Sequence, residues 1–127
     1  MPVEPIRSDG APRAVGPYSQ GTRAGPWIYT SGQIPLTPSG DMIGDDAGAA
    51  VSQALDNVRS ILTAAGASMD DVVHVTLYLR DMDDFTAVNE AYAAYFAAVP
   101  PSRSCVGVAR LPKDARLEIE AVAWVGP

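Results

Sequence analysis

The spacing of apolar residues switches repeatedly between a strand period and a helix period, so this chain is restricted to folds that mix strands with helices. Over residues 45–65, apolar positions recur every three or four residues: Val51, Ala54, Leu55, Val58, Ile61 and Leu62. This spacing predicts an amphipathic helix, because these positions share one helical face. Asp45 or Asp46 can cap its start, and Gly66 can end it.

A second helix is predicted over residues 81–99. Its apolar stripe consists of Phe85, Val88, Tyr92, Tyr95 and Phe96. Asp81 or Asp83 can cap this helix, and Pro100 ends it because proline has no backbone N–H. Asn89 lies within the stripe, where an amide needs a hydrogen-bond partner. Its amide either bonds a loop in a purely structural role or holds a site loop in place.

Alternation of apolar and polar residues predicts strands on both sides of these helices. The predicted strands are a short one within 16–25 and longer ones at 26–34, 72–80, 103–109 and 115–125. In the strand at 72–80 the period of two places Val73, Val75, Leu77 and Leu79 on one face and Val72, His74, Thr76 and Tyr78 on the other.

This order of elements predicts an α+β fold whose two helices cover one face of the sheet. No further element remains to cover the other face, so we expect the chain to associate with copies of itself. The alternative is a sheet face left in water, which antiparallel sheets tolerate.

Composition excludes several classes of function. Nine Lys and Arg against 15 Asp and Glu give a formal charge of −6, which opposes non-specific binding to nucleic acid or anionic lipid. The one cysteine cannot form an internal disulfide, and the one histidine, His74, makes a zinc site or a Ser/His triad unexpected. The start resembles no signal peptide, and the apolar runs are too short for a membrane span. We therefore expect one cytoplasmic domain, residues 1–127, without metal or cofactor.

The segment PPSRSCVGVARLP places a charge and a thiol on a strand. Arg103 and Cys105 share one face by the period of two, and Gly107 on that face leaves space beside the backbone. Glu118 and Glu120 likewise share a face of the last strand. From the residues alone, these charges mark either a solvated strand or a site. A single cysteine is more often a small buried apolar residue than a nucleophile.

Six phrases in order along the chain carry a family resemblance: GPYSQG, TSGQIP, ALDNVRSILTAAGASMDDVV, DMDDFTAVNEAY, RSCVGVARLPKDA and LEIEAVA. Together they resemble the RidA/YjgF family of reactive-intermediate deaminases. The resemblance implies a chorismate-mutase-like fold, with a mixed six-stranded sheet and two helices on one face. It also implies a homotrimer whose sheets form a central barrel, with sites in the clefts between subunits.

The activity that the resemblance implies is that of a 2-iminobutanoate/2-iminopropanoate deaminase, a hydrolase acting on C=N bonds. Its substrates would be small imino and enamine acids such as 2-iminobutyrate and 2-aminoacrylate, and its products a 2-keto acid and ammonia. Neither a cofactor nor a metal is implied.

Catalytic roles are implied for three residues. Arg103 would bind the substrate carboxylate through two parallel hydrogen bonds. Glu118 would orient the attacking water and accept its proton, and Cys105 would place its backbone near the imine nitrogen. The implied substrate-binding residues are Tyr18, Ser31, Asn89 and Arg103.

Other functions stay open on the same residues. A pathway-specific deaminase or tautomerase could use the same fold, because a fold does not settle the substrate. A non-catalytic module for small carboxylates would need Arg103 but not Glu118. RNA cleavage is disfavoured by the acidic balance and by the lack of a histidine pair. The segment AAVPPSRS before the strand is shorter than the family's usual loop, which bears on substrate size.

Overall fold

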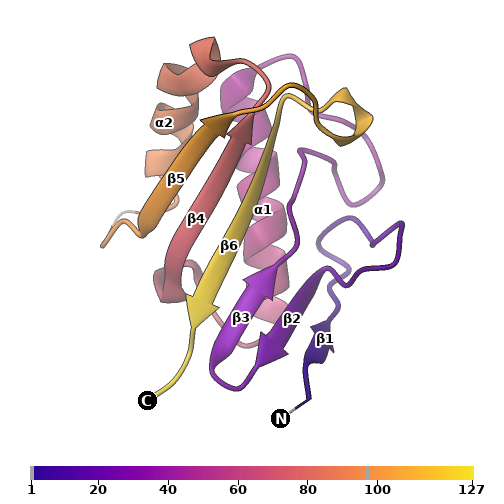
Figure 1. Ribbon diagram of the computed structural model, residues 1–127, viewed down its shortest axis with the longest axis vertical. Helices are drawn as coiled ribbons and strands as arrows, with labels where there is room; N and C mark the ends of the chain where they lie inside the picture. The colour runs from indigo at the N-terminus through magenta and orange to yellow at the C-terminus, as the bar shows by residue number, and fades with distance from the viewer. Residues whose placement is uncertain (1, 97) are drawn as a thin grey trace.

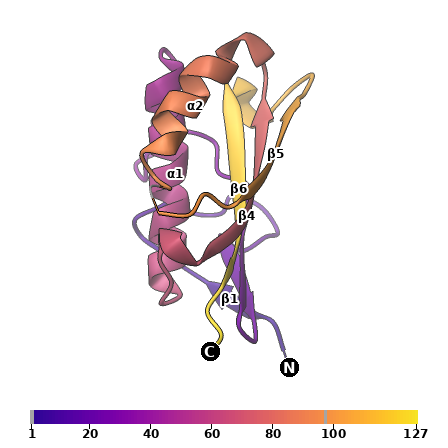
Figure 2. The same ribbon diagram turned by 90° about the vertical axis from the view of Figure 1, so that its left-hand side faces the viewer.

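Two α-helices cover one face of a six-stranded sheet in the computed structural model, which describes residues 2–96 and 98–127 (Figures 1 and 2). The strands are β1 (Glu4–Ile6), β2 (Gly21–Ala24), β3 (Trp27–Thr30), β4 (Val72–Leu79), β5 (Ser102–Gly107) and β6 (Leu117–Trp124). Their order across the sheet is β1-β2-β3-β6-β4-β5. Strands β4 and β5 pair in parallel and the other neighbours pair antiparallel, which confirms the predicted mixed α+β sheet.

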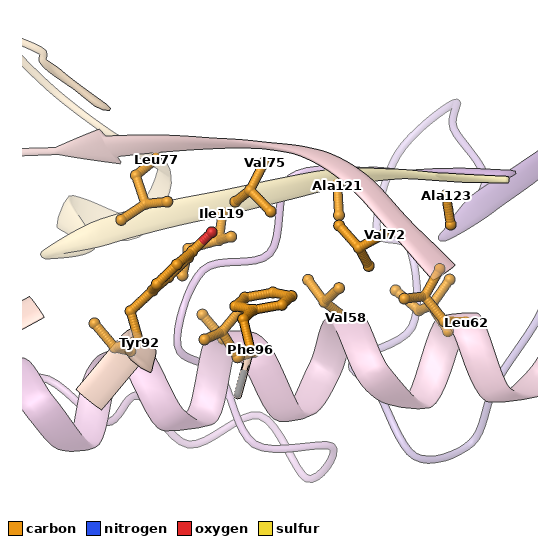
Figure 3. Packing of buried hydrophobic residues seen from close by; sticks show 14 of the residues in the cluster. Val58, Leu62, Val72, Val75, Leu77, Tyr92, Phe96, Ile119, Ala121 and Ala123 are labelled. Carbon is orange, nitrogen blue, oxygen red and sulfur yellow. The ribbon is translucent and has the colours of Figure 1, made fainter. Parts of the chain in front are cut away.

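Helix α1 (Ala47–Ala64) forms where the helical period predicts it. The Asp46 side chain accepts a hydrogen bond from the backbone N–H of Ala49 at 2.8 Å, which caps the helix. Gly66 follows the last turn with φ of +80°, a conformation that glycine adopts without strain. The predicted apolar stripe is buried throughout and packs against the sheet (Figure 3). Burial of this stripe holds α1 on the sheet.

Helix α2 (Phe85–Ala93) is shorter than predicted, and its predicted end at Val99 is wrong. After Ala93 the chain tightens into a turn, in which the backbone N–H of Tyr95 donates to the carbonyl of Tyr92 at 3.0 Å. The Tyr95 hydroxyl donates a hydrogen bond to the Asp56 carboxylate of α1 at 2.7 Å. Ala97, inside the predicted helix, lies outside the described residues.

Three short 3₁₀ turns connect the main elements: η1 (Met69–Asp71), η2 (Met82–Asp84) and η3 (Pro112–Asp114). Asp81, one of the two predicted caps of α2, instead caps η2 by accepting from the Asp83 backbone N–H at 2.9 Å. The turn η2 therefore separates the predicted capping residue from the helix itself.

The predicted faces of β4 are correct from Val75 onward and reversed at its start. Val72 is only 7% exposed, whereas Val73 is 42% exposed. A register shift against β6 lies between Val72 and His74, and such an irregularity interrupts the strict alternation of faces. Period-two reasoning cannot detect this shift, since the sequence alternation continues through it.

Strand β1 is the one element that the predicted strands do not include. It has three residues, of which only Ile6 is buried, so the alternation of apolar and polar residues is too short to predict a strand. The sheet face away from the helices carries several exposed large apolar side chains: Trp27, Tyr29, Val106 and Trp124. Such a face fits the predicted self-association, which stays a prediction. Within the described ranges, no helix is both long and apolar enough to cross a membrane.

Candidate functional site

A cavity of about 330 Å³ lies where the segment after β3 passes the start of β6. Its walls include Tyr18 from the loop after β1, Gly32 and Gln33 after β3, and Glu118 of β6. The backbones of Gln33 and Ile119 bond to each other in both directions, at 2.8 and 3.0 Å. This bridge fixes the loop wall against the strand that carries the carboxylate.

Glu118 packs against the backbone of Gly32 in this cavity. A Cβ atom at position 32 would overlap the Glu118 carboxylate, so a larger residue there would have to displace the carboxylate from its position. Burial raises the pKa of the Glu118 carboxyl above its ordinary value, and the negative charge of Glu120 raises it further. Glu120 itself accepts a hydrogen bond from the Tyr78 hydroxyl at 2.9 Å. A carboxyl with a raised pKa is suited to exchanging protons near neutral pH.

Ser31 braces the cavity from the end of β3. Its hydroxyl donates to the backbone carbonyl of Ser19 at 2.5 Å, and its backbone N–H donates to the carbonyl of Gln20 at 2.8 Å. These bonds tie the loop that carries Tyr18 to the strand beside Glu118. The structure thus brings three of the predicted site residues, Tyr18, Ser31 and Glu118, to one place.

Arg103 belongs to a second cluster, between β5 and α2. Its Nη1 donates a hydrogen bond to the Asn89 side-chain oxygen at 2.9 Å. The guanidinium carbon lies 4.9 Å from the centre of the Tyr92 ring and 5.7 Å from that of Phe85. Aromatic rings attract a guanidinium and fix its plane. Within the described residues this is the one hydrogen bond of the side chain, so most of its five N–H donors remain available to a ligand.

Cys105 is half-buried on the same side of β5 as Arg103 and packs against the apolar core. Burial raises the pKa of its thiol, and the nearby Arg103 charge lowers it by less. The thiol is therefore protonated at neutral pH and is a poor nucleophile. The expected role of the Cys105 backbone near the imine nitrogen stays a prediction.

One chain does not bring the two clusters together. Arg103 pairs with Val75, which is buried under the helices, whereas Glu118 pairs with Tyr78 on the open face. Strand β4 also lies between β5 and β6, so the backbones of the two strands are about 10 Å apart. A small substrate bound to Arg103 cannot reach Glu118 of the same chain through the sheet.

Two buried amides that the sequence interpretation did not assign to the site hold the cavity walls. Gln20 accepts from the Ser8 backbone N–H at 2.7 Å and donates to the Pro12 carbonyl at 2.9 Å. Asn57, fully buried in α1, donates to the Leu36 carbonyl at 2.8 Å. The sequence contained one signal for this role: Asn57 lies within the apolar face of the first helix, and a buried amide needs hydrogen-bond partners. Within the described residues, no cluster of three His, Cys, Asp or Glu side chains could hold a metal ion.

Tyr92, which packs against Arg103, has a buried hydroxyl without a hydrogen-bond partner in the described part of the chain (Figure 3). Replacing it in Tyr92→Phe keeps the ring and removes this unsatisfied group. We expect the free energy of unfolding to rise by about 1 kcal/mol, because an unpaired buried hydroxyl is destabilising. The measurement is urea unfolding followed by circular dichroism.

Tyr95→Phe is the matched control for this substitution. The Tyr95 hydroxyl donates to Asp56 and is 3.0 Å from the Ser52 carbonyl, so its loss should lower the free energy of unfolding by about 1 kcal/mol. A drop in stability for Tyr92→Phe as well would show that the Tyr92 hydroxyl has a partner and would contradict the prediction.

Comparison with known proteins places this chain among close relatives. The family model described as Endoribonuclease L-PSP matches residues 8–125. A 2-iminobutanoate/2-iminopropanoate deaminase of Escherichia coli K12 is 48% identical over 121 residues, which are 93% of this chain and 94% of that protein. A RutC family protein of Pyrococcus horikoshii is 47% identical over 122 residues, with 95% and 97% covered.

A solved structure also matches nearly the whole chain. The crystal structure of E. coli TdcF with bound serine has a TM-score of 0.93 and 43% identity to this chain, and the match covers 97% of this chain and 99% of that one. The fold and the sequence therefore lead to the same group of proteins. This chain belongs to the RidA/YjgF family, whose family model carries the description Endoribonuclease L-PSP.

Proposed function

We propose that this protein hydrolyses small 2-imino acids and their enamine tautomers to 2-keto acids and ammonia. The observation that carries the proposal is the half-buried Glu118 carboxylate in a cavity wall, with its pKa raised by burial and by Glu120. The name of the relative from E. coli K12, a 2-iminobutanoate/2-iminopropanoate deaminase, supports the same chemistry.

Arg103 is proposed to bind the substrate carboxylate. Its guanidinium is held by Asn89 and by the rings of Tyr92 and Phe85, so its plane is set before the substrate arrives. A guanidinium edge matches a carboxylate through two parallel hydrogen bonds, which orient the ligand as well as attract it. Lysine would keep the charge without this orientation.

Glu118 is proposed to act as the general base. Water attacks the carbon of the C=N bond, and the carboxylate takes one proton from that water. The same carboxyl then returns this proton to the nitrogen, which gives a carbinolamine. The carboxylate next relays the proton of the carbinolamine hydroxyl to the amino nitrogen, the C–N bond breaks, and ammonia leaves as the C=O bond forms. One water is consumed, and Glu118 ends the cycle as it began. Its raised pKa favours these transfers near neutral pH.

We further propose that each site is shared between copies of the chain. Arg103 and Glu118 lie on opposite faces of the sheet, so Arg103 of one copy would face the Glu118 cavity of the next. The exposed apolar face around Trp27, Tyr29 and Trp124 provides a surface for such a contact. A head-to-tail contact closes into a ring when the rotation between copies allows it, and a homotrimer is the proposed form.

The test of the proposed function is competition for a trapped imine. Threonine dehydratase generates 2-iminobutyrate, and semicarbazide captures it as a semicarbazone. We expect the native protein to lower semicarbazone formation and Arg103→Ala to be about a hundredfold less effective, because the substrate loses its orientation. Arg110→Ala, at an exposed neighbouring cation, is the matched control and should act like the native chain. No effect of the native protein on trapping would refute the proposal.

A further inference from the structure

In the single chain, before a neighbouring copy covers it, the cavity beside Glu118 is larger than the substrates named above require. Its volume of about 330 Å³ corresponds to the liquid volume of about eleven water molecules. With its carboxylate on Arg103, 2-iminobutyrate would place only the imine carbon, its nitrogen and an ethyl group in this space. The part that the neighbouring copy leaves open can accept a longer side chain.

Two cations line this cavity without a partner of their own. Arg13 and Lys113 both contribute to its walls. Among residues 2–96 and 98–127, neither side chain lies within 4 Å of a carboxylate. The pKa of Glu118 is raised by burial and by Glu120 without an opposing effect of either cation. Both cations line the same cavity as Glu118 and form no ion pair with it within the described residues, so both are available to the far end of a substrate side chain.

The backbone of η3 holds Lys113 at the cavity in an unusual conformation. Lys113 and Asp114 both adopt positive φ, 55° and 54°, a conformation that residues other than glycine rarely adopt. Arg80 stabilises this turn, since its Nη1 is 2.6 Å from the Asp114 carbonyl oxygen and 3.0 Å from its carboxylate. Asp114 pairs with Arg80 and not with Lys113, which lines the cavity. Strained backbone of this kind persists where the surrounding structure enforces it, and it clusters at ligand sites.

We propose that Arg13 and Lys113 bind a carboxylate on the substrate side chain, so that the site prefers 2-imino acids with an acidic side chain. This inference rests on the proposed function. The substrates would be the imines of dicarboxylic amino acids, and the reaction that supplies them is oxidation of the carbon–nitrogen bond of such an amino acid. Hydrolysis converts the C=N bond to C=O with release of ammonia, and the side-chain carboxylate is unchanged.

Three charges would then match the two carboxylates of such a substrate. Arg103 binds the carboxylate next to the imine, and the two cavity cations bind the distal one. Electrostatic pairing at a cavity mouth favours the charged substrate over a neutral one of similar length. In a chain with a formal charge of −6, this local excess of positive charge is what would admit a dianion.

The experiment compares 2-iminoglutarate with 2-iminobutyrate, each generated in situ by an amino-acid oxidase in the presence of semicarbazide. We expect the native protein to have the higher kcat/KM for 2-iminoglutarate. Lys113→Ala and Arg13→Ala should each lower the ratio of the two kcat/KM values about fivefold. Lys113→Arg should keep the ratio, and Arg110→Ala, an exposed cation outside the cavity wall, should leave it at the native value.

The outcomes separate this inference from the proposed function. Hydrolysis of 2-iminobutyrate without a preference for 2-iminoglutarate would leave the proposed function intact and overturn the inference. A native ratio in Lys113→Ala would overturn it too, as would a loss of oligomer mass in that variant, which would place Lys113 in a subunit contact. If neither imine is hydrolysed, the proposed function fails and the inference fails with it.

Discussion

Glu118→Gln should lower kcat for 2-iminobutyrate hydrolysis by about 10²–10⁴-fold, the usual contribution of a general base. Glutamine keeps the shape that fits against Gly32 but cannot accept the proton of the attacking water. The substrate carboxylate is assigned to Arg103, so binding should change little. Isothermal titration with the product, 2-oxobutyrate, should give a dissociation constant within a few-fold of the native one.

The pH dependence of the reaction provides the control for this substitution. The native rate should fall as pH drops through the raised pKa of Glu118, because only the carboxylate form accepts a proton. Glu120→Gln removes a charge that raises this pKa, so its acid limb should move to lower pH. The residual rate of Glu118→Gln should lack this limb.

This pair of measurements also separates an enzyme from a binding module. A module that only captures small carboxylates would bind 2-oxobutyrate through Arg103 and would have no rate for Glu118→Gln to reduce. If Glu118→Gln instead kept the native rate, Glu118 would have no part in the mechanism. Of the two residues, only Arg103 would then still be assigned to the site.

The helices and the inner faces of the long strands could be predicted because burial there follows a regular period. Val51 to Leu62 recur at helical spacing, and Leu117 to Ala123 alternate without interruption. The errors occur where another effect overrides the period. The register shift after Val72 reverses the faces of Val72 and Val73. After Ala93 the backbone tightens from the helix into a turn, although the apolar spacing continues to Tyr95 and Phe96.

The residue types of the candidate site could be predicted, but their grouping within one chain could not. The period of two places Arg103 with Cys105 on one face of their strand and Glu118 with Glu120 on one face of the last strand, as the structure has them. It does not give the order of strands in the sheet. Strand β6 inserts between β3 and β4, which brings Glu118 to the cavity beside Gly32 and leaves Arg103 on the far edge strand.

Mixed oligomers of Arg103→Ala and Glu118→Gln chains should recover activity that neither variant has alone. In a shared site, Arg103 of one copy faces Glu118 of the next. Where the Glu118→Gln chain supplies Arg103 and the Arg103→Ala chain supplies Glu118, the contact contains both intact residues. Random assembly of equal amounts would produce such a contact at about a quarter of all interfaces, and at about a third of those in the mixed trimers that both tags retain. The measurement is the imine-trapping rate of co-expressed, differently tagged chains purified through both tags.

A matched control replaces the Glu118→Gln chain with the double variant Arg103→Ala/Glu118→Gln. No interface in that mixture contains Arg103, so the trapping rate should stay at the level of the single variants. Native mass spectrometry of the doubly purified sample establishes that mixed oligomers have formed. If they form and activity does not return, Arg103 and Glu118 do not act together across a contact between copies. The shared site would then be wrong, because the opposite faces of the sheet that carry Arg103 and Glu118 in one chain leave no other arrangement in which a small substrate meets both.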